Sequence, residues 1–311
     1  MRFNKLDLNL LVALDALLTE QNVTRAGARL HISQSSMSGA LARLRAYFDD
    51  ELFVPIGRSL KPTPFAESLA KPVRNVLLQV ESTVLTKPEF DPATATRTFK
   101  LLISDFSQSI LMTRVLPKLY EQAPGISLEF LLQINNPFEE LERGDVDFLI
   151  IPEHYTSPIQ PKAHLFDETY VCVVWEGNRL VGDTLTMDQY CEMGHVIAQF
   201  GRAHYTLQTW FKAEYGKDIR AEVSTGHLSS LGELLIGTDR IATMHSMLAK
   251  KQARYLPIRL LPLPIPVPPL HQTLQWHHYH DRDPGNQWIR NLLIETSREL
   301  VESESFQQEL L

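Results

Sequence analysis

Two short helical patterns joined by a tight turn, within residues 23–45, constrain the fold of this chain more than any other feature. Apolar residues recur at helical intervals on both sides of a break at Ile32, so each helix has one face to bury. These residues are Val23, Ala26 and Leu30 before the break and Met37, Leu41 and Leu44 after it. The small side chains of Ala26 and Gly27 would let the two helices cross closely. The segment predicts a helix-turn-helix, and the alternative is an ordinary αα-hairpin with a polar cap.

The second helix of this pair opens on small polar side chains. Ser33 precedes its apolar run as a natural N-cap, because its hydroxyl can accept a hydrogen bond from an otherwise free backbone N–H. In a helix-turn-helix the first turns of this helix enter the major groove of DNA, where Gln bonds adenine and Ser bonds either kind of base edge. The candidate DNA contacts of the two helices are Thr24, Arg25, Ser33, Gln34, Ser35, Ser36, Ser38 and Arg43.

A proline-bounded segment, LFVPIGRSLKPTP at residues 52–64, follows the helix pair. Its apolar start and its Gly turn indicate a β-wing whose Arg58 and Lys61 contact DNA phosphates. The helix pair and the wing together predict a winged helix. Charge adds little, since residues 1–63 hold eight Lys and Arg against six Asp and Glu, within a chain whose net charge is −7.

A helical connector is expected after the wing. Its apolar residues recur every three or four positions, a seam suited to pairing with a second copy of the chain or to packing on the chain itself. The seam consists of Phe65, Leu69, Val73, Val76, Val80 and Val84. Pro72 lacks a backbone donor, so a kink or a restart of the helix is expected near Lys71. The Pro, Asp and Thr content of residues 87–97 indicates a linker at the end of the helix.

From residue 97 onward, strand patterns alternate with amphipathic helices. This order predicts an α/β fold of βαβ units with largely parallel sheets. Residues from about 170 to about 265 indicate an inserted second lobe, and the proline-rich return to the first lobe indicates an extended crossover. A final helix is expected with Asp283 as its cap and Pro284 in its first turn. Because ligands of open α/β sheets bind beyond the carboxyl ends of the strands, the cleft between the lobes is the expected effector site.

Long segments of the chain resemble the LysR-type transcriptional regulators. The resemblance begins with residues 6–45 and the wing at 48–64, and it extends over the whole chain. The segments RTFKLLISDF, RGDVDFLIIPE, LFDETYVCVVW and MGHVIAQFGR are similar to the NodD/NahR branch, whose members respond to aromatic compounds such as flavonoids or salicylate. The resemblance implies a homodimer or homotetramer on promoter DNA, RNA polymerase as a further partner, and a small aromatic inducer in the C-terminal domain.

The same resemblance implies a domain plan. A winged helix-turn-helix is expected at residues 1–63 and a linker or dimerisation helix at 64–90. A two-lobed, periplasmic-binding-protein-like effector domain follows, with lobe I at 91–168 and 268–311 and lobe II at 169–267. Gly39 stands where many family members carry arginine, so sequence preference is expected to depend on Gln34, Ser35, the wing and DNA bending.

The resemblance and the rule that ligands bind beyond the carboxyl ends of the strands (the strand-end rule) together predict residues of the inducer cleft. They are Ser104, Asp105, Ile110, Leu111, Asn135, Thr169, Phe200, His204 and Met247, each with capping, core packing or surface exposure as its alternative role. Met247 stands where NahR-like relatives carry an arginine that clamps a carboxylate, and Thr169 stands where such relatives can carry histidine. We therefore expect an uncharged phenolic or flavonoid-like inducer, unless Arg202 supplies a positive charge from the opposite lobe.

Enzyme and metal functions have little support in the sequence. The chain has no GxSxG, HExxH, GxGxxG or GxxxxGK(S/T) signature, so we expect neither an enzyme nor a cofactor. The histidines of WHHYHDRD, residues 276–283, would point to both sides of a strand, which argues against a metal site. Cys172 and Cys191 lack metal or redox spacing and are expected to be small buried hydrophobes.

A solute-binding protein is the other alternative, because such proteins share the two-lobed cleft. The chain has no basic stretch ahead of an apolar segment, which argues against export. It also has no uninterrupted run of about 18 apolar residues that would span a membrane. We expect the protein to stay in the cytoplasm.

Overall fold

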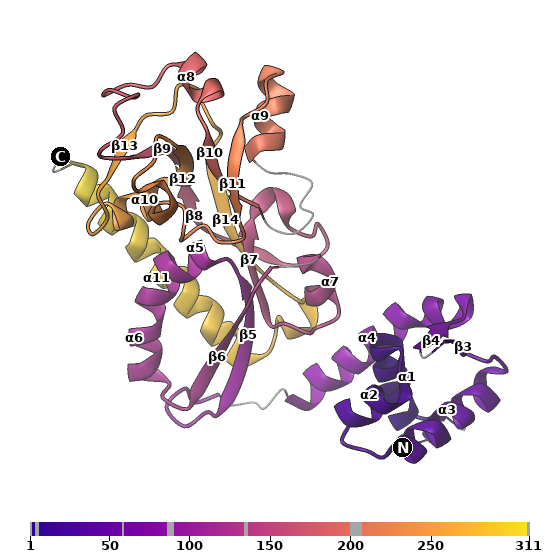
Figure 1. Cartoon of the computed structure of the whole chain (residues 1–311). Coiled ribbons are helices and arrows are strands. Elements are labelled where there is room, and N and C mark those ends of the chain that lie inside the picture. Colours follow the sequence, from indigo (N-terminus) through magenta and orange to yellow (C-terminus); the bar gives the residue numbers. More distant parts are fainter. Residues whose placement is uncertain are drawn as a thin grey trace. The chain divides into compact units, whose positions relative to one another are not determined.

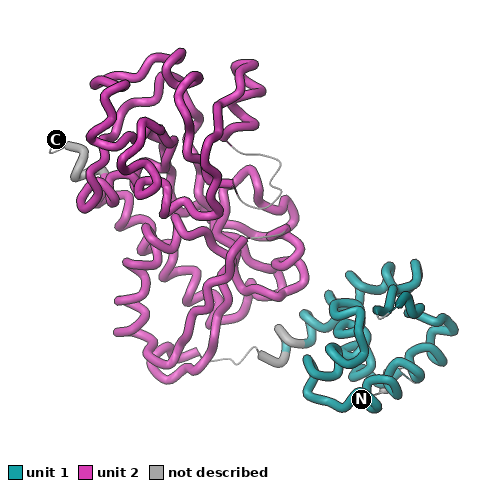
Figure 2. Tube along the Cα trace, in the orientation of Figure 1, with its two compact units in different colours: residues 1–87 teal, residues 88–311 magenta. Residues whose placement is uncertain are grey.

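Two compact units, residues 1–87 and residues 88–311, make up the computed structural model of the chain (Figure 2). The structure describes residues 2–3, 6–57, 59–85, 90–133, 136–199 and 207–309. Within these residues, no helix combines the length and the apolar character that crossing a membrane requires.

Helices and a small β-hairpin form the first unit (Figure 1). The helices are α1 (Asn9–Glu20), α2 (Val23–Arg29) and α3 (Gln34–Phe48). The hairpin pairs β3 (Phe53–Ile56) with β4 (Ser59–Pro62), and a short antiparallel pair, β1 (Arg2–Phe3) with β2 (Leu6–Asp7), precedes α1. Helix α4 (Pro64–Leu85) completes the unit.

Helices α2 and α3 cross closely, as their small residues predict. Ala26 and Gly27 are buried, and a Cβ atom on Gly27 would lie 3.0 Å from the carbonyl oxygen of Ile32. The apolar faces of the helices and the start of the hairpin share one core, which includes Leu14, Leu17, Met37, Leu44, Leu52 and Phe53. The segment is therefore a helix-turn-helix followed by a wing.

Helix α4 continues through Pro72, so of the kink or restart predicted near Lys71 the restart is wrong, and the kink stays a prediction. Packing against α1 holds this part of the helix in place. The Nη1 atom of Arg74 lies 2.7 Å from Oδ2 of Asp15, and Val73 is buried beside this ion pair. These tertiary contacts outweigh the single backbone hydrogen bond that a proline removes.

The predicted apolar seam of α4 divides between two environments. Leu69 and Val73 pack against the core of their own unit. Val76 and Val80 are 44% and 48% exposed, and the side chain of Val84 lies outside the described residues. Packing within the chain therefore accounts for only a part of the seam.

Two five-stranded sheets form the second unit, one in each lobe (Figure 1). Lobe I has the order β6-β5-β7-β14-β8, with β5 (Arg97–Ile103), β6 (Ile126–Leu131), β7 (Phe148–Pro152), β8 (Lys162–Glu168) and β14 (Leu270–Trp276). Lobe II has the order β11-β10-β12-β9-β13, with β9 (Tyr170–Trp175), β10 (His195–Ala198), β11 (Ala221–Thr225), β12 (Ile241–His245) and β13 (Ile258–Leu261). The chain crosses between lobes after β8 and again before β14.

Both sheets are mixed, so the expectation of largely parallel sheets is wrong. In parallel pairs, β5 joins β6 and β7, and β10 joins β11 and β12. The antiparallel pairs all involve β8, β9, β13 or β14, the strands next to the two crossovers. A chain that arrives from the other lobe can enter a sheet in either direction, without the helical crossover that joins parallel neighbours.

Helices flank both sheets. In lobe I, α5 (Asp105–Ser107), the π-helix η1 (Gln108–Met112) and α6 (Thr113–Gln122) follow β5 directly, and α7 (Pro137–Glu142) precedes β7. Lobe II contains α8 (Met187–Glu192), α9 (Leu207–Tyr215) and α10 (Ser246–Gln252). Short 3-10 helices are η2 (Glu153–Tyr155), η3 (Glu233–Leu235) and η4 (His278–His280).

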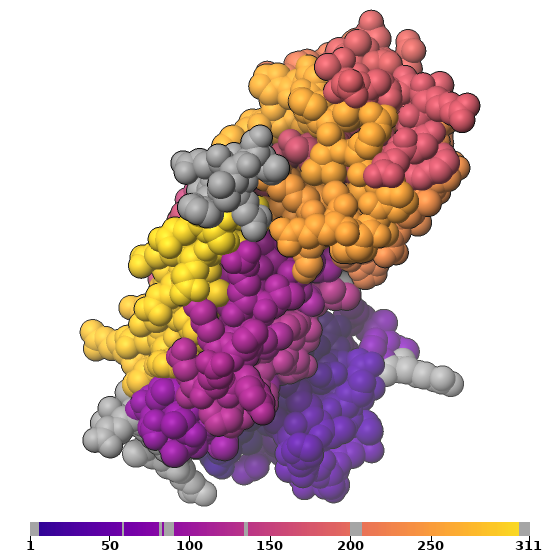
Figure 3. Space-filling view, turned by 90° about the vertical axis from the view of Figure 1, so that its left-hand side faces the viewer, coloured from indigo at the N-terminus to yellow at the C-terminus, as the bar shows by residue number. Residues whose placement is uncertain are grey.

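The last helix, α11 (Pro284–Glu309), lies along η1 and α6, and Figure 3 shows it in yellow beside the magenta segment. Its predicted cap is confirmed, since Oδ1 of Asp283 accepts hydrogen bonds from the N–H groups of Gly285 and Asn286.

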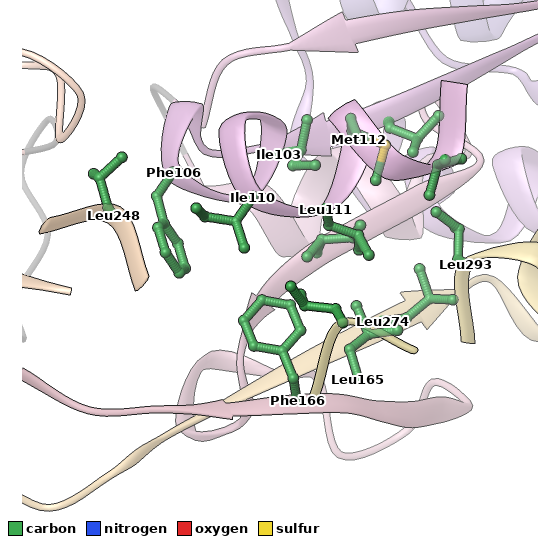
Figure 4. Close-up of a cluster of buried hydrophobic side chains, with 14 of the residues drawn as sticks. Ile103, Phe106, Ile110, Leu111, Met112, Leu165, Phe166, Leu248, Leu274 and Leu293 are labelled. Atoms are coloured by element: carbon green, nitrogen blue, oxygen red, sulfur yellow. The ribbon is translucent and has the colours of Figure 1, made fainter. Parts of the chain in front are cut away.

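A continuous apolar core joins the two lobes at the turn after β5. Figure 4 shows Phe106 and Ile110 of this turn close to Leu248, which α10 contributes from lobe II. Leu111 packs on the other side with Leu274 of β14. The start of α5 and η1 is therefore the place where lobe I meets lobe II.

Candidate nucleic-acid interface and effector cavity

The first turns of α3 present polar side chains to solvent. Ser33 caps the helix as predicted, because its Oγ accepts a hydrogen bond from the N–H of Ser36 at 3.1 Å. The exposed residues are Ser33, Gln34, Ser35, Ser36 and Ser38. Met37 and Ala40 lie on the opposite face and are buried in the core of the unit. The apolar face anchors the helix, and its polar start stays open to a partner.

Further candidate DNA contacts on the helices are exposed as well. Arg25 is near Glu20, with 3.5 Å between Nε and Oε2, and Arg43 lies 3.9 Å from Asp7. The two arginine side chains are 66% and 64% exposed, and ion pairs in such positions contribute little to stability. Both guanidinium groups can therefore leave these carboxylates and bind DNA phosphates with little loss of free energy. Thr24 is also exposed.

The wing is a short hairpin with an exposed cation. Gly57 has a φ of +62° at its turn, a conformation that favours glycine. Lys61 on β4 is exposed. Arg58, the other cation expected in the wing, lies outside the described residues.

Arg45 positions the wing, a role that sequence reasoning missed. Its Nε donates to the carbonyl oxygen of Glu51 at 2.7 Å, and its Nη2 donates to that of Phe53 at 2.8 Å. One side chain near the end of α3 thus holds the start of β3. No local pattern marks such a residue, because its partners become neighbours only when the chain turns back.

A cavity of about 1220 Å³ lies between the lobes of the second unit. Its wall includes residues 150–152 at the end of β7 in lobe I and residues 195–198 of β10 in lobe II. Residues 267–270, next to the crossover into β14, close another side. This is the edge at which α/β sheets bind ligands, and the volume exceeds the range of about 300–1,000 Å³ typical of drug-sized sites.

Neutral side chains form the wall wherever the structure describes it. The wall contains no Lys, Arg, Asp or Glu among the described residues. Its aromatic and proline residues include Phe106, Phe138, Trp210, Pro268 and Pro269. Its polar residues include Ser104, Gln133, Asn136, Tyr170, Thr243 and Gln272.

Burial keeps the histidines of the wall uncharged. It lowers the pKa of His245 and that of His195 to about 4, from an ordinary value of 6.5, and it also lowers the pKa of His154. An imidazolium in these positions would lose its hydration without an adequate replacement. At neutral pH the described wall therefore carries no formal charge.

Of the described effector candidates, only Ser104 lines the cavity. Asp105 instead crosses the lobe boundary, where its Oδ2 accepts a hydrogen bond from the N–H of Ser229 at 2.7 Å. Ile110 and Leu111 lie in the apolar core and do not line the cavity (Figure 4). The turn after β5 directs both side chains into the core where the lobes meet, and their part in effector binding stays a prediction.

Thr169 and Met247 also lie away from the cavity wall, at the first crossover. Their N–H groups donate to the carboxylate of Glu168, at 2.7 Å to Oε1 and 3.2 Å to Oε2 respectively. Glu168 is 2% exposed, and burial raises its pKa to about 7. The other candidates, Asn135, Phe200 and His204, lie outside the described residues, as does Arg202.

His245, Gln272 and Tyr170 line the cavity and were missed by sequence reasoning. His245 ends β12 and Tyr170 begins β9, and their rings lie 5.1 Å apart. The strand-end rule could have indicated His245, since it directly follows a strand pattern. Gln272 lies within β14 and gives no local signal.

The WHHYHDRD segment is structural. His277 accepts a hydrogen bond from the N–H of Tyr279, and His278 contacts Oε1 of Gln160 at 3.1 Å. Within the described ranges, no three His, Cys, Asp or Glu residues are placed to hold a metal ion. Cys172 is buried as expected, and Cys191 is half-buried.

The sequence and the fold are both similar to those of known proteins. Residues 8–67 match the family described as bacterial regulatory helix-turn-helix protein, lysR family, and residues 93–298 match the LysR substrate binding domain. Nodulation protein D 1 from Bradyrhizobium elkanii is 44% identical over 296 residues, which cover 95% of this chain and 94% of that protein.

Solved structures agree with these matches. The crystal structure of a "probable transcriptional regulator" from Pseudomonas aeruginosa has a TM-score of 0.64 and 28% identity, covering 93% of this chain and 97% of that one. A full-length OxyR variant from Pseudomonas aeruginosa has a TM-score of 0.71 at 17% identity, over 94% and 95% of the two chains. This second likeness is one of fold.

Proposed function

The chain belongs to the LysR family of DNA-binding transcriptional regulators, and on this premise we propose that it responds to an uncharged aromatic molecule bound between its two lobes. The observation that carries the proposal is the cavity wall, which is largely apolar and free of formal charge within the described residues. An aromatic ring gains free energy by leaving water for such a wall. A carboxylate would lose its hydration there without meeting a cation.

The sequence supports the same class of ligand. NahR-like relatives carry an arginine that clamps a carboxylate at the position of Met247. Here that side chain is a thioether and lies away from the cavity wall, so position 247 offers a carboxylate no charge-assisted hydrogen bond. The similarity to Nodulation protein D agrees with the resemblance to the NodD/NahR branch, whose members respond to aromatic compounds. The volume of the cavity accommodates a phenolic or flavonoid-like molecule of several rings.

At the other end of the chain, the start of α3 is the proposed reader of DNA sequence. The exposed Gln34, Ser35, Ser36 and Ser38 would contact base edges, with Ser33 holding the end of the helix. The proposed phosphate contacts are Thr24, Arg25, Arg43, Arg58 and Lys61.

Promoter DNA, an effector and further copies of the same chain are the partners of LysR regulators. For this chain we propose a homodimer or homotetramer in the cytoplasm that also contacts RNA polymerase. The exposed Val76 and Val80 of α4 support self-association through residues 64–90. Effector binding would act by favouring one arrangement of the lobes, and it can do so only through its different affinities for the two arrangements.

Calorimetric titration of the full chain tests the proposed ligand class. We expect a hydroxyflavone to bind and salicylate to bind at least about tenfold more weakly, which corresponds to about 1.4 kcal/mol. Tight binding of salicylate with weak or absent binding of the phenol would contradict the proposal, as would binding of neither.

A DNA-binding assay separates this function from that of a solute-binding protein with the same two-lobed cleft. We expect the purified chain to protect DNA upstream of its own gene, and the ligand that binds in calorimetry to alter the footprint. Tight ligand binding by a protein that shifts no promoter fragment would favour the solute-binding alternative. The match of residues 8–67 to a regulatory helix-turn-helix family supports the regulator.

A further inference from the structure

Two polar atoms of the cavity wall are buried and have no hydrogen-bond partner among the described residues. They are Nδ1 of His245, at the end of β12, and Oε1 of Gln272, on β14. The two residues are 9% and 2% exposed, and both line the cavity. A buried polar atom without a partner costs free energy that a ligand atom can recover.

The same turn of lobe I holds both side chains. Nε2 of Gln272 donates to Oγ of Ser107 at 2.7 Å. The ring of His245 stacks on that of Phe106, with 4.2 Å between centroids and 15° between planes. Phe106 and Ser107 are consecutive, so this turn contacts both side chains, Gln272 from lobe I and His245 from lobe II.

The chemistry of these atoms restricts what can satisfy them. With Nε2 of Gln272 directed at Ser107, Oε1 remains for the ligand, and an amide oxygen can only accept. A neutral imidazole carries one donor and one acceptor nitrogen. The charge of Asp105 acts on His245, so an anion placed here would be repelled.

We propose that Gln272 and His245 together recognise a hydroxyl group on the aromatic ring system of the effector. The hydroxyl donates to Oε1 of Gln272 and accepts from Nδ1 of His245, since one hydroxyl group can do both. A ketone or a carboxylate offers no donor to Oε1. This inference rests on the proposed function, because it assumes that an aromatic molecule enters the cavity. In this arrangement one hydroxyl group of the effector contacts both Gln272 of lobe I and His245 of lobe II.

Calorimetry with flavone and the series of monohydroxyflavones tests the inference on the full chain. We expect one or more monohydroxyflavones to bind the unchanged protein about tenfold more tightly than flavone, the ratio that one well-made hydrogen bond supplies. Gln272→Leu removes the acceptor, and His245→Phe keeps a ring against Phe106 while removing the nitrogen. Each substitution is expected to bring the ratio close to one while flavone still binds.

Gln208→Leu is the matched control, because Gln208 also lines the cavity but is not among the residues with a buried, unpartnered atom. It is expected to keep the tenfold ratio. If Gln272→Leu does not fold, as judged by circular dichroism, His245→Phe carries the test.

Equal binding of flavone and all monohydroxyflavones to the unchanged protein overturns the inference, and so does a tenfold ratio that survives in the folded variants. In both results flavone still binds, so the proposed function stands. Binding of neither flavone nor its derivatives contradicts the proposed function, and the inference fails with it.

Discussion

Replacing Glu168 by Gln is expected to change the stability of the second unit in a pH-dependent way. Glu168 ends β8 at the first crossover between the lobes, where the N–H groups of Thr169 and Met247 donate to its carboxylate. It is 2% exposed, and burial raises the pKa of its carboxyl from an ordinary 4.5 to about 7. Backbone hydrogen bonds and the charge of Lys250 oppose this rise without cancelling it.

The sign and the size of the effect follow from linkage. A raised carboxyl pKa means that the folded chain binds this proton more tightly than the unfolded chain, so its contribution to stability is lost as the pH rises through 7. A difference of about 2.5 pKa units corresponds to about 3 kcal/mol. Glutamine, like the protonated carboxyl, keeps one acceptor oxygen. In the place of Oε1 this oxygen lies 2.7 Å from the N of Thr169 and 3.4 Å from that of Met247, and glutamine never ionises. Glu168→Gln should therefore match the unchanged chain near pH 4.5 and be more stable by about 3 kcal/mol above pH 7.

Urea unfolding followed by tryptophan fluorescence measures this difference. The four tryptophans, Trp175, Trp210, Trp276 and Trp288, all lie in the second unit, so the signal reports on the unit that contains Glu168. The lowered pKa values of His195 and His245 make the stability of both proteins fall as the pH falls below 6.5. This contribution cancels when the variant is compared with the unchanged chain at each pH.

Glu214→Gln, on the exposed surface of α9, is the matched control and should show no pH-dependent difference. A free-energy difference for Glu168→Gln that stays constant from about pH 5 to about pH 8, or that shrinks with rising pH, would refute the reasoning.

Three further substitutions test the DNA-binding unit. Gln34→Ala is expected to lower the preference for one base at one position of the DNA site by about 1–3 kcal/mol, measured by competition binding. If the substitution instead weakens binding to all DNA sequences equally, Gln34 is a positioning contact. Gly39→Arg should be tolerated, because no atom lies within 4 Å of its added Cβ, and it should steepen the salt dependence of DNA binding by about one phosphate contact. An unchanged salt dependence would show that position 39 does not face DNA. Arg45→Ala removes both hydrogen bonds to the start of the wing, so it should lower the free energy of unfolding, measured by calorimetry, by about 1–3 kcal/mol and also weaken DNA binding. The stability and DNA affinity of Arg45→Lys should lie between those of Arg45→Ala and the unchanged chain. Equal DNA binding by the unchanged chain and both variants would contradict the positioning role.

Features decided by a few neighbouring residues were predictable from the sequence. The cap of α3 by Ser33 and that of α11 by Asp283 depend on the local backbone and one side chain. The close crossing at Gly27 depends on side-chain size in one short segment. Periodicity likewise indicated the helix-turn-helix and the two-lobed α/β unit, because each element must bury one face.

Features decided by distant residues were not predictable in this way. The propensity of Pro72 to interrupt a helix was outweighed by the packing of α4 on α1, including the ion pair between Arg74 and Asp15. The antiparallel direction of the strands next to the crossovers depends on where the chain passes from one lobe to the other. Ile110 and Leu111 belong to the core because the turn after β5 is buried by both lobes.

By itself, the sequence determined that this chain combines a helix-turn-helix and wing with a two-lobed α/β unit, and it identified the polar start of α3. Only the tertiary structure decided the character of the effector cavity. His245 and Gln272 come from different sheets, and no motif in the sequence links the two residues. Burial leaves their polar atoms unpartnered and keeps His245 neutral, because removing a group from water changes the free energy of its charge and of its hydrogen bonds. Burial is a property of the packed chain, and no short segment carries it.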